Sequence, residues 1–403
     1  MKILQLCKKF PYPLKDGEAI AVSHLSKALH QLGAELDLLA MNTKKHFFEI
    51  DQLPAEYNHY RQIYTQTIDN EIKWWDALVN LFSDESYHIA RFVSDAFGQK
   101  LRQLLQQNDY DVVQLETLYL APYIPIIRRH SKATVVMRAH NVEHEIWERV
   151  AQNTSFLPKR WYLHHLLKKL RRYEIEQLQG YDLLVAITER DLETFRRLGY
   201  RGRALVTPIG VDRGDYLADM SSYRREVSIS FIGSLDWMPN QEGLSWFLDQ
   251  VWQPLQERFP KLSLHIAGRN TPDSIRRLKC RNVKIYGEVP DAGDFINQHS
   301  IMVVPLLSGS GMRAKIIEGM ALGKVVITTS LGLEGIDAVH RREVLVADSV
   351  EEFLDCFRYC VESNGQLQTL GHSAREFVHE NYDSQSVARR LLEVYREKNV
   401  IVY

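Results

Sequence analysis

Short apolar runs alternate with longer stretches of helical periodicity through the first half of the chain. Such runs are typical of strands that are buried on both faces of a sheet. Strands are predicted at residues 2–7, 35–40, 111–115, 134–137, 182–186 and 204–207. Because helical patterns separate many of these runs, the sequence predicts a parallel, doubly wound α/β sheet.

The same alternation resumes in the second half after a break. Pro208 and Gly210 mark the end of the last run of the first half, and residues 213–226 are polar without a long apolar pattern. Further strands are predicted at 228–233, 262–268, 283–287, 301–307, 325–329 and 344–347, and closing helices at 350–360, 366–380 and 384–398. We therefore expect two doubly wound domains, residues 1–207 and 208–383.

Composition agrees with two globular domains and narrows the range of functions. The chain has 403 residues, of which 45% are hydrophobic and 25% charged, so both domains can bury a core. A formal charge of −1 gives no overall field that would attract nucleic acid. The 4 cysteines are scattered, the apolar stretch at the N-terminus is too short for a signal peptide, and no window has the roughly 18 apolar residues of a membrane span. These features favour a cytoplasmic protein with reduced thiols and no nucleic-acid partner.

The segment 301–337 carries the clearest chemical signal. Its apolar run ends at Ser308-Gly-Ser-Gly311, and apolar residues at helical spacing follow over residues 312–322. Glycines allow a sharp turn and a close approach of backbone to a ligand. The free N–H groups and the dipole of the following helix would point at this turn, so the sequence predicts an anion site there.

Two cations and a carboxylate extend this prediction. Arg313 and Lys315 lie in the first turn of the predicted helix, where positive charge is unfavourable by roughly 0.3–1 kcal/mol unless an anion binds. Glu318 lies about 4.5 Å further along the axis, on the face that carries Lys315. A diphosphate bound by the cations and a ribose bound by the carboxylate would fit this spacing. A solvated Lys–Glu pair on an ordinary helix is the alternative.

The same glycines also fit the dinucleotide fingerprint. Gly309, Gly311 and Ala314 have its spacing, and Glu334 lies at the distance of a ribose-binding acid. In a dehydrogenase the fingerprint follows the first strand of the binding domain, whereas several strand and helix units precede it here. An oxidoreductase is therefore the minor alternative.

His140 and Asn141 follow a predicted strand. Ligands on doubly wound sheets bind beyond the carboxyl ends of strands. This pair therefore either hydrogen-bonds a polar substrate, or His140 is a histidine whose hydrogen bonds are satisfied within the core.

Residues His140 to His144 also fit the pattern H-x-x-E-H, but zinc chemistry needs both histidines on one helix. The DxD motif at Asp109 and Asp111 precedes a strand instead of following one. We therefore expect no metal at either motif.

Two further features each have two interpretations. Gly17, directly ahead of a predicted helix, either lets backbone approach a ligand or is a plain turn glycine. Residues 159–172 form a basic amphipathic helix, which either lies on an anionic membrane leaflet or packs on its own domain with its charges in solvent. Peripheral contact with the inner face of a membrane is consistent with the first interpretation of this helix.

Motifs along the whole chain resemble one enzyme family. The second half contains FIGSLDW, HIAGRN, VKIYGEVPD and GSGMRAKIIEGMALGKVVITTSLGLEGI, VTPIGVD lies between the halves, and the first half contains FPYPLKDG and RAHNVE. Together they resemble the group 1, family 4 retaining glycosyltransferases. The resemblance implies a GT-B fold, in which two Rossmann-like domains face each other across a cleft. It implies an acceptor-binding N-terminal domain, a donor-binding C-terminal domain, and a last helix, about residues 384–403, that crosses back to the first domain.

The resemblance also implies roles for individual residues. Arg313 and Lys315 would bind the donor diphosphate, Glu318 the ribose, and His140 the transferred sugar. Other residues would line the binding sites: Gly233, Ser234, Gly287, Glu288, Val289, Gly309, Ser310 and Gly311 for the donor, and Gly17 and Asn141 for the acceptor or sugar. The E-x7-E motif of the family would place its first glutamate at Ser310. The usual arginine and lysine after the first C-domain strand are also absent, with Ser234 and Met238 in that region.

The reaction implied by the resemblance transfers a sugar from a nucleotide-diphosphate sugar to a glycan or lipid-linked acceptor, with retention and without a metal or another cofactor. Polysaccharide or lipopolysaccharide synthesis is the process it suggests. The leaving phosphate would take the acceptor's proton, while the cations and the helix N-terminus stabilise its charge. A nucleotide-sugar epimerase or dehydrogenase, and a catalytically silent protein that binds sugar nucleotides, are the alternatives.

Overall fold

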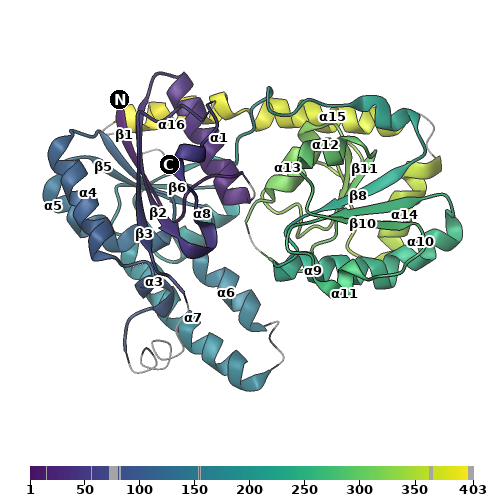
Figure 1. The fold of residues 1–403 in the computed structure, drawn as a ribbon, viewed down its shortest axis with the longest axis horizontal. Coiled ribbons are helices and arrows are strands. Elements are labelled where there is room, and N and C mark those ends of the chain that lie inside the picture. The colour runs from purple at the N-terminus through teal and green to yellow at the C-terminus, as the bar shows by residue number, and fades with distance from the viewer. Residues whose placement is uncertain are drawn as a thin grey trace. The chain divides into compact units, whose positions relative to one another are not determined.

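The computed structural model describes residues 1–14, 16–55, 57–71, 80, 83–152, 154, 156–309, 311–362 and 366–397. The chain forms two units: residues 1–209 with 384–403 make unit 1, and residues 210–383 make unit 2 (Figure 1). Each unit contains one parallel sheet covered by helices. Within the described ranges, we find no helix with the length and apolar content needed to cross a membrane.

The sheet of unit 1 has 7 parallel strands in the order β3-β2-β1-β4-β5-β6-β7. Its strands are β1 (Lys2–Cys7), β2 (Glu35–Thr43), β3 (Gln62–Ile68), β4 (Val112–Leu115), β5 (Thr134–Ala139), β6 (Leu183–Ala186) and β7 (Arg203–Val206). Lys2 of β1 pairs with Glu35 of β2, and Ile3 pairs with Val112 of β4. The strand order reverses between β1 and β4, which is where ligands of doubly wound sheets bind.

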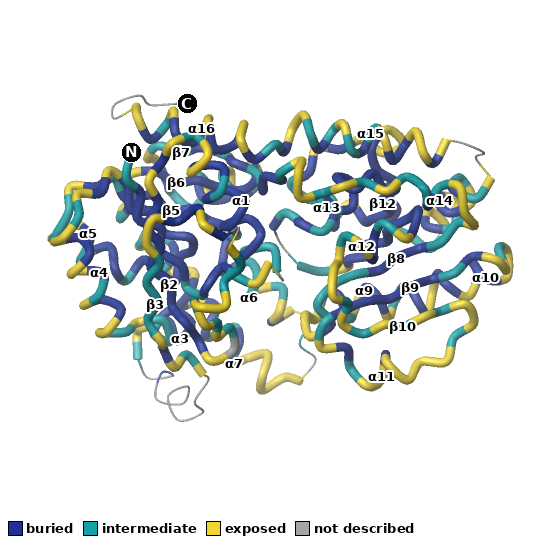
Figure 2. Tube along the Cα trace, turned by 45° about the horizontal axis from the view of Figure 1, so that its top comes forward, coloured by how far each residue is buried: buried dark blue, intermediate teal, exposed yellow. Residues whose placement is uncertain are grey.

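Helices cover both faces of this sheet. They are α1 (Gly17–Gln31), α3 (Tyr87–Ala90), α4 (Asp95–Gln107), α5 (Ile124–His130), α6 (Glu143–Gln152), α7 (Leu157–Gln177), α8 (Glu189–Arg197) and α16 (Ser384–Arg396). Alternate residues of β1 enter different core clusters, because successive side chains of a strand point to opposite faces. Ile3 packs in the cluster that contains Leu391 of α16, and Leu4 in the cluster that contains Leu101 of α4. Figure 2 shows the resulting pattern of buried strands between helices with exposed outer faces.

The sheet of unit 2 has 6 parallel strands in the order β10-β9-β8-β11-β12-β13. Its strands are β8 (Ser228–Ile232), β9 (Ser263–Ala267), β10 (Val283–Gly287), β11 (Ile301–Val304), β12 (Val325–Thr328) and β13 (Leu345–Val346). Its helices are α9 (Met238–Trp246), a π-helical turn (Phe247–Trp252), α10 (Gln253–Arg258), α11 (Asp273–Arg276), α12 (Ala292–Asn297), α13 (Ala314–Ala321), α14 (Val350–Glu362) and α15 (Gln366–Asn381).

The predicted α/β class with doubly wound parallel sheets is confirmed, and the differences are local. Strand β3 was not predicted, because its sequence QIYTQTI is polar and its side chains are mostly half-buried at the sheet edge. The strand predicted at 301–307 ends at Val304, directly before Pro305, which has no N–H to continue the ladder. Unit 2 begins at Gly210, and its Val211 forms a parallel bridge with Asp383 at the other end of the unit.

Candidate functional site

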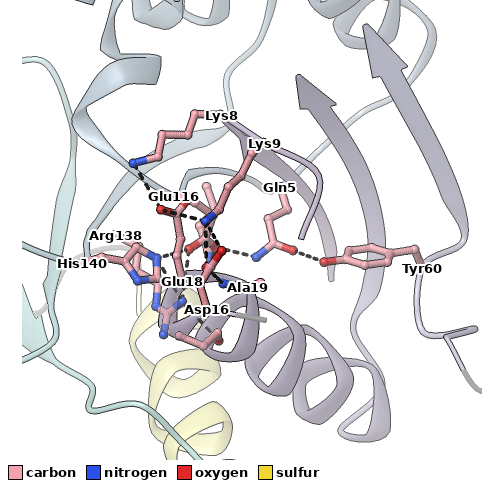
Figure 3. Close-up of polar contacts among 12 residues, drawn as sticks. Gln5, Lys8, Lys9, Asp16, Glu18, Ala19, Tyr60, Glu116, Arg138 and His140 are labelled. Carbon is pink, nitrogen blue, oxygen red and sulfur yellow. Dashed lines mark hydrogen bonds and ion pairs between the residues drawn. The ribbon is translucent and has the colours of Figure 1, made fainter. Parts of the chain in front are cut away.

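Charged side chains gather at the carboxyl ends of the central strands of unit 1 (Figure 3). Lys8 and Lys9 follow β1, Glu116 follows β4, and His140 follows β5. Because these strands are parallel and adjacent, their ends meet at one edge of the sheet. This edge includes the reversal of strand order between β1 and β4. The predicted position of His140 is therefore confirmed, and it lies in a cluster of charges that sequence reasoning did not assemble.

Glu116 is the centre of this cluster and is completely buried. Its Oε2 accepts hydrogen bonds from Arg138 Nη1 at 3.1 Å and His140 Nε2 at 2.8 Å. Its Oε1 accepts from Gln5 Nε2 at 2.5 Å and from the side-chain amide of Gln114. Burial alone would raise the pKa of Glu116, but the Arg138 charge and the hydrogen bonds from His140 and Gln5 outweigh it and lower the pKa to about 2. The carboxylate is therefore ionised at neutral pH.

Two buried tyrosines extend this network away from the sheet edge. Tyr60 donates a hydrogen bond from its hydroxyl to Gln5 Oε1 at 2.6 Å, and Tyr395 donates one to Gln114 Oε1 at 2.5 Å. Because Tyr395 belongs to α16, the C-terminal helix is connected to Glu116 through one glutamine. Each glutamine uses its oxygen for a tyrosine and its nitrogen for Glu116, so both amide orientations are fixed.

The Glu116 carboxylate determines which nitrogen of His140 carries the hydrogen. An ionised carboxylate can only accept, so the bond at 2.8 Å requires a hydrogen on Nε2. Burial and the positive charge of Arg138 lower the pKa of His140, which keeps the ring neutral at neutral pH. Its Nδ1 is then an acceptor, and it has no hydrogen-bond partner in the part of the chain that the structure describes. His140 is thus satisfied on one side and able to accept a hydroxyl hydrogen on the other.

Two ion pairs surround the start of α1. Lys9 Nζ lies 2.7 Å from Asp16 Oδ1, and Lys8 Nζ lies 3.2 Å from Glu18 Oε2. Asp16 also accepts from Ala19 N at 3.0 Å as the N-cap of α1. Gly17 is the first residue of this helix. The lysines were not predicted as site residues, although charges directly after a buried strand are a signal for the ligand edge.

A small pocket lies beside His140 in unit 1. Its lining includes Thr117, Asn141, Glu143 and Glu174. Burial and the Glu174 charge outweigh the opposing Lys8 charge and raise the pKa of Glu143 to about 7. Asn141 therefore lies with His140, as predicted, and the pocket can present a carboxyl group that titrates near neutrality.

Neither motif that resembles a metal site brings metal ligands together. His144 Nδ1 lies 2.5 Å from Glu174 Oε2 in α7, whereas His140 precedes α6 and contacts Glu116. Asp111 Oδ2 accepts from the backbone N of Lys2 at 2.8 Å, at the amino ends of the strands. Among the described residues, no group of three or more His, Cys, Asp or Glu side chains could hold a metal ion.

The glycine turn of unit 2 lies between β11 and α13. Gly309 and Gly311 have backbone φ angles of 112° and 77°, which residues other than glycine rarely adopt. Ser310 lies outside the described residues. The helix begins at Ala314, so the predicted start at residue 312 was wrong by two residues, and Arg313 is its N-cap. The guanidinium of Arg313 is buried against the turn, and its Nη1 donates to the carbonyl oxygen of Gly311.

Lys315 and Glu318 each contact a residue outside α13. Lys315 Nζ donates to Asn240 Oδ1 at 2.7 Å and lies 5.3 Å from the ring centroid of Phe231. Burial and the Arg313 charge lower the pKa of Lys315 to about 7. Glu318 Oε1 accepts from the hydroxyl of Tyr216 at 2.9 Å. Sequence reasoning missed Asn240 and Tyr216, because neither lies near α13 in the chain.

The other predicted donor residues follow the ends of β8 and β10. Gly233 directly follows β8, and a Cβ there would lie 2.7 Å from Asn240 Nδ2. That nitrogen donates to the carbonyl oxygen of Ser234 at 2.8 Å, so Asn240 joins the β8 turn to Lys315. Gly287 ends β10 with a φ of 72°, and Glu288 and Val289 follow it. The structure therefore places these residues at the carboxyl edge that also holds the glycine turn.

Comparison with protein families divides the chain in the same way. Residues 16–214 match the family described as Glycosyltransferase Family 4, and residues 226–363 match the family described as Glycosyl transferases group 1. A protein of Klebsiella pneumoniae, described as an uncharacterized 44.6 kDa protein in the cps region, is 23% identical over 96% of this chain and 97% of its own length.

Solved structures with a similar fold extend over nearly the whole chain. Sucrose-phosphate synthase from Thermosynechococcus elongatus has a TM-score of 0.73 at 16% identity, and covers 98% of this chain and 99% of its own. Anabaena HepE in complex with UDP has a TM-score of 0.69 at 15% identity, covering 98% and 100%. A trehalose-phosphate synthase from Burkholderia xenovorans, in complex with glucose-6-phosphate, has a TM-score of 0.69 at 13% identity, covering 98% and 100%. At these identities the similarity establishes the fold.

Proposed function

Because the chain belongs to the group 1, family 4 glycosyltransferases and has their GT-B fold, we propose that it transfers a sugar from a nucleotide-diphosphate sugar to a hydroxyl acceptor with retention of configuration. The observation that carries this proposal is the geometry around the glycine turn of unit 2. There a glycine turn, the N-terminus of α13, the buried Arg313 and the half-buried Lys315 lie together. These are the groups that bind a diphosphate.

The same groups would stabilise the leaving nucleoside diphosphate. Negative charge grows on the phosphate oxygens as the glycosidic bond breaks, and positive charges fixed in a buried site stabilise it more strongly than water does. A leaving-group oxygen then takes the proton of the acceptor hydroxyl on the same face of the sugar. In this mechanism the chain supplies the charge through Arg313 and Lys315, and neither a metal nor another cofactor takes part.

Unit 1 would bind the acceptor and orient the transferred sugar. His140 Nδ1 is an acceptor for a sugar hydroxyl, and Glu116 keeps the opposite nitrogen protonated. Glu116 is thus a positioning residue for His140. Asn141 and the backbone at Gly17 lie at the same sheet edge and would contact the acceptor.

The acceptor is proposed to be a glycan or lipid-linked sugar in polysaccharide or lipopolysaccharide synthesis. The Klebsiella relative from the cps region supports this, since it matches almost the full length of the chain. UDP and UDP-glucose are named in structures of Anabaena HepE, so uridine nucleotides are the first donors to test.

A panel of UDP-, GDP- and ADP-sugars tests the proposal. We expect one donor class to release nucleoside diphosphate slowly without acceptor and faster with a glycan acceptor, and EDTA to leave the rate unchanged. Binding without release would identify a silent sugar-nucleotide binder. Conversion of the donor without an acceptor, or reduction of a nicotinamide, would identify an epimerase or a dehydrogenase. Any of these three results would overturn the proposal.

Glu318→Ala is expected to weaken nucleotide binding by about 1.5–3 kcal/mol, the scale of hydrogen bonds to a charged group, because the ribose loses its carboxylate partner. Calorimetry with UDP and 2′-deoxy-UDP measures this, and the preference of the wild type for the ribonucleotide should disappear in the variant. Tyr216→Phe is the matched control, since it removes the neighbouring hydroxyl at 2.9 Å and retains the carboxylate. Equal losses in the two variants would contradict the assignment.

A further inference from the structure

Helix α7 has one exposed face with an unusual distribution of charge. The sequence from Leu157 to Tyr173 contains no Asp or Glu. Eight exposed or half-exposed residues recur at intervals of three, four or one, so they share one side of the helix. They are Leu157, Arg160, Trp161, His164, His165, Lys168, Arg171 and Arg172; the other exposed or half-exposed residues of this stretch are Pro158, Lys159, Tyr162 and Tyr173. From Leu157 to Arg172 every charged side chain on this face is basic, and Arg172 at its C-terminal end pairs with Asp84 and with Glu176 one turn further along α7.

The opposite face of α7 is occupied by its own domain. Leu163, Leu166, Leu167 and Leu170 are buried. Lys169 also points inward, and its Nζ donates to the carbonyl oxygen of Ser83 at 2.6 Å. The inner face of α7 therefore packs on its own domain, which is one of the two interpretations of this helix. This packing does not account for the exposed apolar and basic side chains of the outer face.

The N-terminal end of the outer face carries several large apolar side chains next to Arg160. Phe156, Leu157 and Trp161 are 66%, 73% and 65% exposed, and Val150 at the end of α6 is 42% exposed. Single exposed apolar residues are ordinary, but several large ones at one end of a helical hairpin mark an interaction site. Figure 1 shows the α6–α7 hairpin extending beyond the strands of unit 1.

We propose that this face of α7, with the apolar end of the hairpin, docks on a lipid bilayer that contains anionic headgroups. A bilayer surface can bind both the apolar and the basic side chains of this face. Trp161 and its apolar neighbours can enter the headgroup region while the basic side chains contact lipid phosphates. A second copy of the chain would bring the same positive charges and be repelled. The proposal does not depend on which sugar the enzyme transfers, or on whether it is a transferase.

Sedimentation of the full-length protein with vesicles tests the proposal. We expect binding to phosphatidylcholine vesicles that contain phosphatidylglycerol, little binding to phosphatidylcholine alone, and weaker binding at high salt, because salt screens exposed charges. Tryptophan emission should shift to shorter wavelength on binding, and Trp161→Phe should remove most of this shift. Equal binding to both vesicle types would overturn the proposal, and so would no binding to either.

Charge reversal on α7 provides the matched comparison. Lys168→Glu with Arg171→Glu is expected to reduce vesicle binding at least tenfold. Arg102→Glu with Arg129→Glu makes the same change in net charge on exposed positions of α4 and α5, and should reduce binding far less. Circular dichroism confirms that the variants fold. Equal losses in the two pairs would show a dependence on net charge alone and overturn the assignment to α7.

Discussion

Replacing Glu116 with alanine is expected to lower the free energy of unfolding by about 3–5 kcal/mol, the usual loss when one partner of a buried ion pair is removed. The substitution leaves the guanidinium of Arg138, which is itself completely buried, without its counter-charge. It also removes the acceptor for His140, Gln5 and Gln114. Urea denaturation of the wild type and the variant measures the difference. The exposed residue Glu193 on α8 is the control, and Glu193→Ala should change stability by less than about 0.5 kcal/mol.

Glu116→Gln separates the charge from the shape of this side chain. The amide oxygen can still accept a hydrogen bond, so the loss of stability should be smaller than in the alanine variant. The pH dependence should change as well. The folded pKa of Glu116 is about 2, below its ordinary value of 4.5, so its charge stabilises the fold above pH 4.5 and this contribution is lost as pH falls towards 2. The glutamine variant should lack that part of the acid transition.

Enzyme activity tests whether Glu116 orients His140. With glutamine at 116, the amide can donate to the ring as well as accept, and Nε2–H is no longer enforced. We expect kcat to fall more than KM rises, and nitrogen NMR of His140 to show a mixture of tautomers in place of Nε2–H alone. In a His140→Ala background, Glu116→Gln should have little further effect on kcat. A full additional loss in that background would contradict a positioning role.

Strand positions could be predicted from the sequence because apolar runs were short and bounded by turns. The run at 134–137 placed His140 at a carboxyl end, and the glycines at 309 and 311 placed the turn that precedes α13. In each case one local pattern was sufficient. Parallel sheets require their strands to be covered on both faces, so buried runs were visible without knowledge of the partners.

The contacts that complete each site could not be predicted, because they depend on strand order. Glu116 meets His140 only because β4 lies beside β5, and Gln5 joins them because β1 lies on the other side of β4. In unit 2, Asn240 and Lys315 are 75 residues apart in sequence, and no periodicity relates them. Charges directly after buried strands were the one available signal, and it would have identified Lys8, Lys9 and Glu116 as candidates.

Donor binding is expected to weaken as pH rises above 7, by up to tenfold for each pH unit, because the diphosphate binds the protonated form of Lys315. Burial and the Arg313 charge lower the pKa of Lys315 to about 7, so the side chain loses its proton just above neutrality in the free protein. A bound diphosphate favours the charged form and raises this pKa. Binding above pH 7 must therefore take up a proton. Calorimetry with UDP-glucose at pH 8, in buffers of different ionisation enthalpy, should detect an uptake approaching one proton.

Lys315→Met tests the assignment of this proton. The variant should bind donor about 2–5 kcal/mol more weakly at pH 6.5, the scale for a charged partner removed from a buried pair, and should bind without proton uptake. Lys261→Met changes an exposed lysine of the same unit and should alter neither quantity. The pKa of Lys324 is also lowered, to about 8, mainly by burial. Its Nζ donates to Ser222 Oγ and to backbone oxygens, so donor binding should not change its titration. Proton uptake that persists in Lys315→Met would therefore show that another group, and not Lys315, meets the diphosphate.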